Sequence, residues 1–435
     1  MTEHELAFVA TNDLCAITRG RAMPLARLDP EAGCGWVPAN LGVGAFGSIV
    51  EGSPFDATGD LRLLPDPRSL TRIDGVPGRP PLTVLLADIT HTDGTPWACC
   101  PRTFLRRAAA DLEQEAGLQL LAAFEHEFML VTDAPAPPPM SLQAMLRAEP
   151  LGTELVGILA EAGLEPENWL AEYGRHQCEI TVAAADALTA ADRAVLLRDI
   201  VRNLAHARGQ QASFAPLLEP DAVGNGVHVH FSLRDAAGVP AMYDAARPGG
   251  LSAAAGSFAA GIIRHARALL AFTAASEVSY LRLAPHRWSA THAFLGERNR
   301  ESMLRLCPTF ELPGRGPAGQ LNLEFRAGDA TGNPWLVLGV LIRAGLEGIR
   351  AQLPAPVLLD RPIEAVGEEE RHRTGIARLP GSLPEALVAL QEDPVVSGWF
   401  APELLQVHRA LKLDELRRLE GLDDAGKCRS YASVY

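Results

Sequence analysis

The chain has 435 residues, of which 47% are hydrophobic and 21% are charged, which suits a soluble globular enzyme with a large core and room for two domains. Its net charge of −14, with no basic stripe or tail, argues against nucleic acid or an anionic membrane as a main partner. Seven scattered cysteines without a CxxC spacing, an acidic amino terminus and the lack of a bilayer-length apolar run predict a cytoplasmic protein.

The first hundred residues are predicted to form a small β-rich domain. Residues 5–11 and 82–89 are strand-like, and the segment 59–67 is typical of a strand that ends in a proline turn. Pro101 then opens a helix with apolar residues on one face. We therefore place the division near residue 100, with an amino-terminal domain at 1–100 and a second domain at 101–435.

The second domain alternates predicted strands and helices. Strands are expected at 118–131, 169–182 (as a pair), 227–233 and 319–327, and helices at 151–163, 187–208, 251–275, 335–350, 383–391 and 402–419. This order favours a large mixed α/β domain with a mainly antiparallel sheet.

A glycine-rich loop running into a strand at 224–233 carries two histidines. Val229, Phe231 and Leu233 alternate with His228, His230 and Ser232, so both imidazoles and the hydroxyl are expected on one face of the strand. A pair of histidines on a strand is often a structural, hydrogen-bonded pair, and by itself this pattern does not decide between that role and ligand binding.

Carboxylates recur at strand spacing elsewhere in the domain. Glu125 and Glu127 are two residues apart, Glu172 and Glu179 flank a plausible turn, and Glu324 lies two residues before Arg326. Each motif alone is most often a solvated strand face or a cross-strand ion pair. Together, however, five carboxylates on interior strands are costly unless they are protonated or paired with cations. Carboxylates with one or two imidazoles suit Mg²⁺ or Mn²⁺.

The second half of the domain supplies arginines. They are Arg282, Arg298, Arg300, Arg305 and Arg326. Guanidinium groups match carboxylates and phosphates, and divalent metals with an arginine cluster suit phosphoryl transfer. Since the sequence has no Walker A motif, a nucleotide would be held in another way.

The order of these motifs resembles the glutamine synthetase family. The segments that carry the resemblance are Glu125-His126-Glu127-Phe128, Glu172…Gln177-Cys178-Glu179, the glycine loop and histidine strand at 225–233, Ser279-Tyr280-Leu281-Arg282, Asn299-Arg300…Arg305, and Asn322-Leu323-Glu324-Phe325-Arg326 with Asp329…Asn333-Pro334. The resemblance implies an α+β fold, in which a small β-grasp-like amino-terminal domain precedes a large catalytic α/β domain with a curved antiparallel sheet.

The resemblance also implies roles for individual residues. It implies one metal at Glu127, Glu172 and Glu179, a second at Glu125, His228 and Glu324, and two to three Mg²⁺ or Mn²⁺ ions per site. His230, Ser232, Arg305 and Glu167 would face ATP. Arg282 and Arg300 would act in catalysis and, with Gly224 and Arg326, hold a glutamate-like acid and the transferred phosphate. In the family, ATP phosphorylates the γ-carboxylate of glutamate and an amine displaces the phosphate.

The sequence departs from ammonia-using members of that family in two places. Trp288 stands where those members have a carboxylate on a flap over the site, and Phe46 aligns with the aspartate of an amino-terminal loop. Ammonium binding needs anionic partners, whereas a tryptophan and a phenylalanine make the pocket apolar. The pattern therefore resembles the branch that makes γ-glutamyl amides of organic amines. A third departure, Val223 where an asparagine is common, leaves open an acid related to glutamate.

The sequence is therefore compatible with three functions. The leading hypothesis is an ATP-dependent ligase that joins a glutamate-like acid to an organic amine, and the alternatives are an ammonia-dependent glutamine synthetase and a non-catalytic structural or regulatory homologue. The last would be expected to lack metal ligands, yet all six positions are filled. The resemblance further implies homo-oligomers of stacked hexameric rings, commonly dodecamers, with sites at subunit interfaces.

Overall fold

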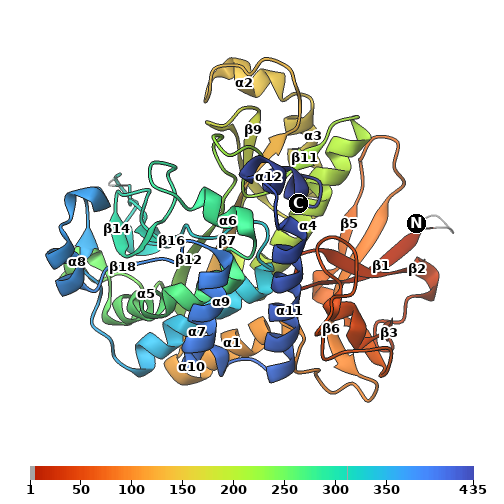
Figure 1. Cartoon of the computed structure of the whole chain (residues 1–435), viewed down its shortest axis with the longest axis horizontal. Coiled ribbons are helices and arrows are strands. Elements are labelled where there is room, and N and C mark those ends of the chain that lie inside the picture. The colour runs from red at the N-terminus through yellow and green to blue at the C-terminus, as the bar shows by residue number, and fades with distance from the viewer. Residues whose placement is uncertain (1–4, 311) are drawn as a thin grey trace.

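The computed structural model describes residues 5–310 and 312–435, in which two large β-sheets of different size are accompanied by a separate two-stranded sheet (Figure 1). The smaller sheet lies at one end of the molecule and the larger sheet forms the centre of the other part, surrounded by helices. The long carboxy-terminal helix α11 (Pro402–Leu419) lies between the two parts. In the described part of the chain, no helix has the length and apolar character needed to cross a membrane.

The amino-terminal sheet has six strands in the order β2-β1-β6-β4-β3, with β5 paired to β6. The strands are β1 (Leu6–Asn12), β2 (Thr18–Pro24), β3 (Cys34–Trp36), β4 (Leu61–Pro65), β5 (Thr71–Ile73) and β6 (Leu82–His91). β6 is nearly continuously apolar because it is central: it pairs parallel with β1 and antiparallel with β4. The strands predicted at 5–11, 59–67 and 82–89 are confirmed. The proposed division at residue 100 falls between β6 and the first long helix.

The larger sheet has ten strands in the order β17-β14-β15-β16-β12-β7-β9-β8, with β10 and β11 also paired to β7. Its strands are β7 (Leu118–Leu130), β8 (Pro166–Ala171), β9 (Gln177–Val182), β10 (Ala185–Asp186), β11 (Ala212–Ser213), β12 (Val227–Asp235), β14 (Leu295–Glu297), β15 (Leu304–Leu306), β16 (Leu323–Phe325) and β17 (Leu358–Leu359). Only the pairings of β14 are parallel, which confirms a mainly antiparallel sheet. A short pair, β13 (His292–Ala293) and β18 (Ala377–Arg378), lies apart.

Helices pack around this sheet. The long ones are α1 (Pro101–Ala116), α4 (Ala187–Ala207), α5 (Ala253–Thr273), α7 (Pro334–Arg350) and α11. The shorter ones are α2 (Leu142–Arg147), α3 (Leu151–Glu161), α6 (Glu277–Arg282), α8 (Glu368–Thr374), α9 (Leu383–Glu392), α10 (Pro394–Ser397) and α12 (Asp424–Ala432). Their ends follow from local chemistry. Asn333 caps α7, where Pro334 is the first helical residue, and Asp186 caps α4.

Two predicted elements differ from the observed ones. The strand expected at 319–327 is limited to Leu323–Phe325, since residues 317–319 form a 3₁₀ turn. The helix expected at 251–275 begins only at Ala253, because the Ser252 side chain accepts the backbone N–H of Ala255 and caps it.

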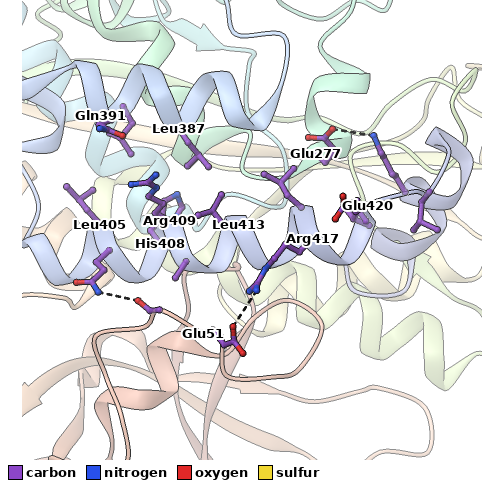
Figure 2. Close-up of a pocket in the computed structure, with 18 of the residues that line it drawn as sticks. Glu51, Glu277, Leu387, Gln391, Leu405, His408, Arg409, Leu413, Arg417 and Glu420 are labelled. Carbon is purple, nitrogen blue, oxygen red and sulfur yellow. Dashed lines mark hydrogen bonds and ion pairs between the residues drawn. The ribbon is translucent and has the colours of Figure 1, made fainter.

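The loop at 43–52 of the amino-terminal domain is held on α11 (Figure 2). Arg417 lies 3.5 Å from Glu51, and the Gln406 amide donates to the carbonyl of Gly52 at 3.2 Å. Arg418 donates to the hydroxyl of Ser48 in the same loop. Beside these contacts, a largely apolar groove of about 1200 Å³ separates α9 from α11. These contacts fix the position of the loop that carries Phe46, one of the predicted site residues.

A buried arginine joins the two domains. Arg102, in the first turn of α1, donates to Asp192 of α4 through two nitrogens at 2.7 and 3.0 Å. Its guanidinium also reaches Asp66 at 3.1 Å and Asp88 at 3.3 Å, both in the amino-terminal domain. Arg102 is only 1% exposed, and Asp192 depends on it for a charge partner, whereas Asp66 and Asp88 also pair with Arg106 at 3.2 and 2.8 Å.

We expect Arg102→Ala to lower the free energy of unfolding by about 3–5 kcal/mol, because it leaves Asp192 buried without its cation. Chemical denaturation followed by circular dichroism measures the change. The matched control is Arg107→Ala, an exposed arginine of the same helix, which should change stability by no more than about 0.5 kcal/mol. Equal effects of the two substitutions would contradict a linking role for Arg102.

Candidate active site

Strand register brings the predicted carboxylates and histidines together on one face of the ten-stranded sheet. β7 pairs with β12, which places His228 opposite Glu125, and it pairs on its other side with β9, which places Glu127 opposite Glu179. β16 adds Glu324 opposite His230. Val229, Phe231 and Leu233 are buried on the other side of β12, so the predicted alternation is confirmed.

His228 lies at the centre of this group. Its Nδ1 is 2.7 Å from Oε1 of Glu125, 3.7 Å from Glu324 and 3.9 Å from Glu127. Gly226 is required two residues earlier, because a Cβ there would lie 2.5 Å from the His228 ring. The Gly226 N–H also donates to Glu127 at 2.7 Å, so the glycine loop positions both the imidazole and a carboxylate.

Gln177 ties the β8–β9 turn to the glycine loop. Its side-chain amide donates to the carbonyl of Gly224 and to Oδ1 of Asn225, both at 3.0 Å, and to Glu127 at 3.3 Å. Asn225 is itself buried and donates to the carbonyls of Ser213 and Ala215. These two amides fix the loop and the carboxylates of neighbouring strands relative to one another.

The carboxylates of the site have strongly divergent pKa values. Burial, followed by the charges of Glu125, Glu127 and Glu172, raises the pKa of Glu179 to about 9, and burial with the charge of Glu127 raises the pKa of Glu172. Burial opposes ionisation of Glu324 as well, but the charge of Arg326 lowers its pKa to about 2. Likewise, the two histidines hold the pKa of Glu125 well below its usual range against the effect of burial.

The carboxylates with lowered pKa, Glu125 and Glu324, have cationic partners in the protein, whereas those with raised pKa, Glu172 and Glu179, lie among other carboxylates. Glu125, Glu127 and His228 offer donor atoms within 4.8 Å of one another, as do Glu125, His230 and Glu324. Glu172 and Glu179 add further carboxylates whose mutual repulsion a cation would relieve. Oxygen and imidazole donors in this number fit Mg²⁺ or Mn²⁺.

The predicted arginines surround the same carboxylates. Arg305 donates to Glu324 at 2.7 Å, and Arg326 pairs with the other oxygen of that carboxylate. Arg326 also donates to the carbonyls of Arg300 at 2.8 Å and Trp288 at 3.2 Å. It therefore links a carboxylate of the cluster to the segment that carries Trp288.

Arg282 reaches the site from α6, and its guanidinium donates to the carbonyl of Gly328 at 2.6 Å. Gly224 allows this approach, because a Cβ there would lie 2.5 Å from the arginine side chain. By contrast, the Arg300 side chain has no hydrogen bond or ion pair within residues 5–310 and 312–435. Its guanidinium is therefore free to bind an anion.

A cavity of about 810 Å³ collects most of the predicted site residues. Those that line it are Glu125, Glu127, Glu172, Glu179, Gly224, His228, His230, Arg282, Trp288, Arg300, Arg305, Glu324 and Arg326. Glu167 and Ser232 instead line a neighbouring cavity of about 390 Å³, which shares Glu125 and His230 with the first. The arrangement provides two neighbouring compartments that have Glu125 and His230 in common, with the other carboxylates of the cluster in the larger one.

Phe46 does not line either cavity. Its ring lies on Tyr431 of α12, with the ring centroids 5.6 Å apart. Within a single chain, therefore, Phe46 is separated from the carboxylate cluster. Trp288, in contrast, lines the larger cavity with its side chain half-exposed.

Several residues of the site lie outside the sequence-based predictions. Gln177 and Asn225 belong to the recognised motifs, but the sequence assigns them no role, whereas in the structure they lock the glycine loop. Oδ1 of Asn322 accepts a hydrogen bond from Nδ1 of His230 at 3.0 Å, and Sγ of Cys307 lies 3.7 Å from the same nitrogen. Tyr173, next to Glu172, lines the cavity and contacts Trp288. Of these residues, only Gln177, Asn225 and Asn322 could be found from the sequence, because they lie within the matched motifs.

Comparison with known proteins agrees with this geometry. The glutamine synthetase N-terminal domain matches residues 2–97, and the glutamine synthetase catalytic domain matches residues 98–431. The chain belongs to the glutamine synthetase family. It is accordingly an ATP-dependent ligase that forms carbon–nitrogen bonds, and divalent metal ions are used in this family.

The relatives include enzymes with different acceptors. The chain is 33% identical to gamma-glutamylpolyamine synthetase GlnA3 of Streptomyces coelicolor, over 99% of this chain and 93% of the relative. It is 32% identical to glutamine synthetase of Thermus thermophilus, over 80% of each. Among solved structures, a novel glutamine synthase homolog is 43% identical with a TM-score of 0.91, covering 100% of this chain and 99% of that one. A GmaS–ADP complex is 27% identical with a TM-score of 0.81, covering 98% and 96%.

We expect Glu324→Ala to weaken Mn²⁺ binding by about 100-fold or more and to abolish ADP formation from ATP, because it removes a donor and leaves Arg305 and Arg326 unpaired. Isothermal titration with Mn²⁺ and a coupled ADP assay measure both effects. Glu161→Ala, at the exposed end of α3, is the control and should change neither. ADP formation by a folded Glu324→Ala protein at the original rate would contradict the metal assignment.

Proposed function

We propose that this enzyme phosphorylates the γ-carboxylate of glutamate, or of a close relative, and joins it to an organic amine, releasing ADP and phosphate. The observation that carries the proposal is Trp288, a half-exposed tryptophan in the cavity that holds the carboxylate cluster, at the position where ammonia-using members have a carboxylate. An indole cannot attract ammonium or accept its proton as a carboxylate does, but it binds the carbon body of a larger amine.

The similarity to gamma-glutamylpolyamine synthetase GlnA3 over nearly the whole of both chains supports this acceptor class. Similarity at 29–32% to several glutamine synthetases supports the shared ligase chemistry without deciding the amine. An ammonia-dependent glutamine synthetase is therefore the competing proposal. A non-catalytic homologue is disfavoured because all six proposed metal ligands are present.

We assign the proposed metal ligands to two sets. Glu127, Glu172 and Glu179 would hold one divalent ion, and Glu125, His228 and Glu324 a second. When bound, these ions would neutralise negative charge on the phosphates of ATP. The residues fit this role because four carboxylates crowd one another and burial raises the pKa of Glu179 and Glu172.

The remaining residues bind and orient the two substrates. His230, Ser232 and Glu167 lie around the smaller cavity, which we assign to ATP, and Arg305, in the larger cavity beside Glu324, would hold its phosphates. Arg300, whose guanidinium has no partner in the described part of the chain, would bind the γ-phosphoryl group as charge builds up on it. Arg282 and Gly224 would hold the acid, with Arg326 keeping Arg300 and Trp288 in place.

The reaction then proceeds in two transfers. The γ-carboxylate oxygen of the acid attacks the terminal phosphorus of ATP, and ADP leaves. The amine nitrogen next attacks the acyl carbon, the carbon–oxygen bond to phosphate breaks and phosphate leaves with the bonding electrons, and the proton lost from the nitrogen passes to water. Phosphorylation is needed because a free carboxylate at neutral pH resists attack by an amine.

We expect purified enzyme with glutamate to release ADP faster with organic amines than with ammonium, and mass spectrometry to identify the γ-glutamyl amide. Trp288→Glu should reverse the order, because a carboxylate attracts ammonium while the apolar surface is lost. Turnover of ammonium alone by the unaltered enzyme would establish the glutamine synthetase alternative. Formation of no ADP with any amine would support the non-catalytic one.

We further propose that the enzyme assembles as stacked hexameric rings, in which Phe46 of one subunit completes the neighbour's acceptor pocket. Within one chain Phe46 rests on Tyr431, on a loop that α11 holds in place. We expect gel filtration at a multiple of the 46.5 kDa chain mass. Phe46→Ala should lower kcat/KM for organic amines without dissociating the assembly. A fully active monomer would contradict both statements.

A further inference from the structure

Two aromatic side chains form a wedge at the larger cavity. The rings of Tyr173 and Trp288 have centroids 4.8 Å apart and planes inclined at 60°, and both residues line the cavity. Although they touch, Tyr173 remains 49% and Trp288 52% exposed. Met140, which also lines the cavity and is half-exposed, adds a third apolar surface.

The backbones that present this wedge are held firmly. Tyr173 lies in the turn between β8 and β9, where the backbone N–H of Glu172 donates to Gln177 at 2.9 Å and that of Gln177 donates to Gly174 at 3.1 Å. Its own N–H donates to the Glu172 carboxylate at 3.1 Å. The backbone position from which the Tyr173 ring projects is therefore fixed, and it lies one residue after Glu172, a proposed metal ligand.

Trp288 is held in an unfavourable conformation. Its φ of 54° lies in the left-handed region, which is costly for a bulky residue. The carbonyl of Trp288 accepts from Arg326, and the preceding residue, Arg287, donates to the carbonyls of Pro220 and Ala222 at 2.5 and 3.1 Å. The surrounding contacts thus maintain a strained backbone that turns the indole onto Tyr173.

We propose that Tyr173 and Trp288 together form the acceptor subsite, and that Tyr173 is a specificity-determining residue for primary amines with an apolar body of several carbons. This inference rests on the proposed function. The amine nitrogen would reach the acyl phosphate beside Glu172, while the carbon body lies in the aromatic wedge. Aromatic faces also attract cations. Besides the methylenes of an amine, the wedge would therefore bind the distal ammonium of a diamine.

The test uses the full-length enzyme and measures kcat/KM for methylamine, propylamine, butylamine, 1,4-diaminobutane and benzylamine. In the unaltered enzyme we expect kcat/KM to rise by up to about fourfold for each added methylene that enters the wedge. Tyr173→Ala should remove most of this dependence, lowering the butylamine value by roughly tenfold more than the methylamine value. Tyr173→Phe should retain the dependence, because the ring is kept.

Two further variants separate a shared subsite from independent effects. Trp288→Gly, which suits the left-handed backbone, should lower the same butylamine-to-methylamine ratio. In the double variant, the butylamine-to-methylamine ratio should fall by less than the product of the two single reductions, since either substitution opens the same wedge. Leu142→Ala, an exposed residue of α2 that does not line the cavity, is the control and should leave the ratio unchanged.

The outcomes distinguish this inference from the proposed function. If the unaltered enzyme uses ammonium and no organic amine, the proposed function fails. If it uses organic amines but Tyr173→Ala lowers kcat/KM equally for methylamine and butylamine, while the thermal midpoint is unchanged, the aromatic subsite is overturned. A diamine preference that survives in Tyr173→Ala would also overturn it.

Discussion

The crowding of carboxylates on one face of the ten-stranded sheet is the constraint on which the rest of the site depends. Glu125, Glu127, Glu179 and Glu324 meet there because β7 pairs with both β12 and β9 while β16 closes the other side of β12. Such a group is stable only with cations close by. Arg305 and Arg326 provide them for Glu324, whereas the raised pKa of Glu179 marks the side that a metal would complete.

The same arrangement connects the carboxylate cluster with the proposed acceptor subsite. Arg326 binds Glu324 and, through two further nitrogens, the carbonyls of Arg300 and Trp288. One guanidinium therefore fixes a carboxylate of the cluster, the segment that would bind phosphate and the segment that carries the indole. Through Glu172 and Tyr173, the β8–β9 turn makes an equivalent connection from the other side of the cavity. Under the proposed function, acceptor choice would thus depend on residues attached directly to the carboxylate cluster.

The amino-terminal domain is attached to the larger domain at two places. Arg102 bridges carboxylates of both domains, and α11 holds the loop that carries Phe46. Within one chain, this loop does not reach the cavity. A role at a neighbouring site, as proposed, would explain why a loop outside the cavity is attached to α11.

The sequence by itself determined the family, the fold class and the approximate positions of the long helices and of several strands that carry the site, because strand alternation, helix caps and the ordered motifs are local properties of the chain. It also picked out thirteen residues that the fold gathers in one cavity. Only the tertiary structure decided which groups meet: that Arg326 is used by three protein partners, that Gln177 locks the glycine loop, and that Tyr173 faces Trp288. Apart from the Arg326–Glu324 pair, these contacts join residues 26 to more than 100 positions apart, and they depend on strand register and loop packing, which no local pattern encodes.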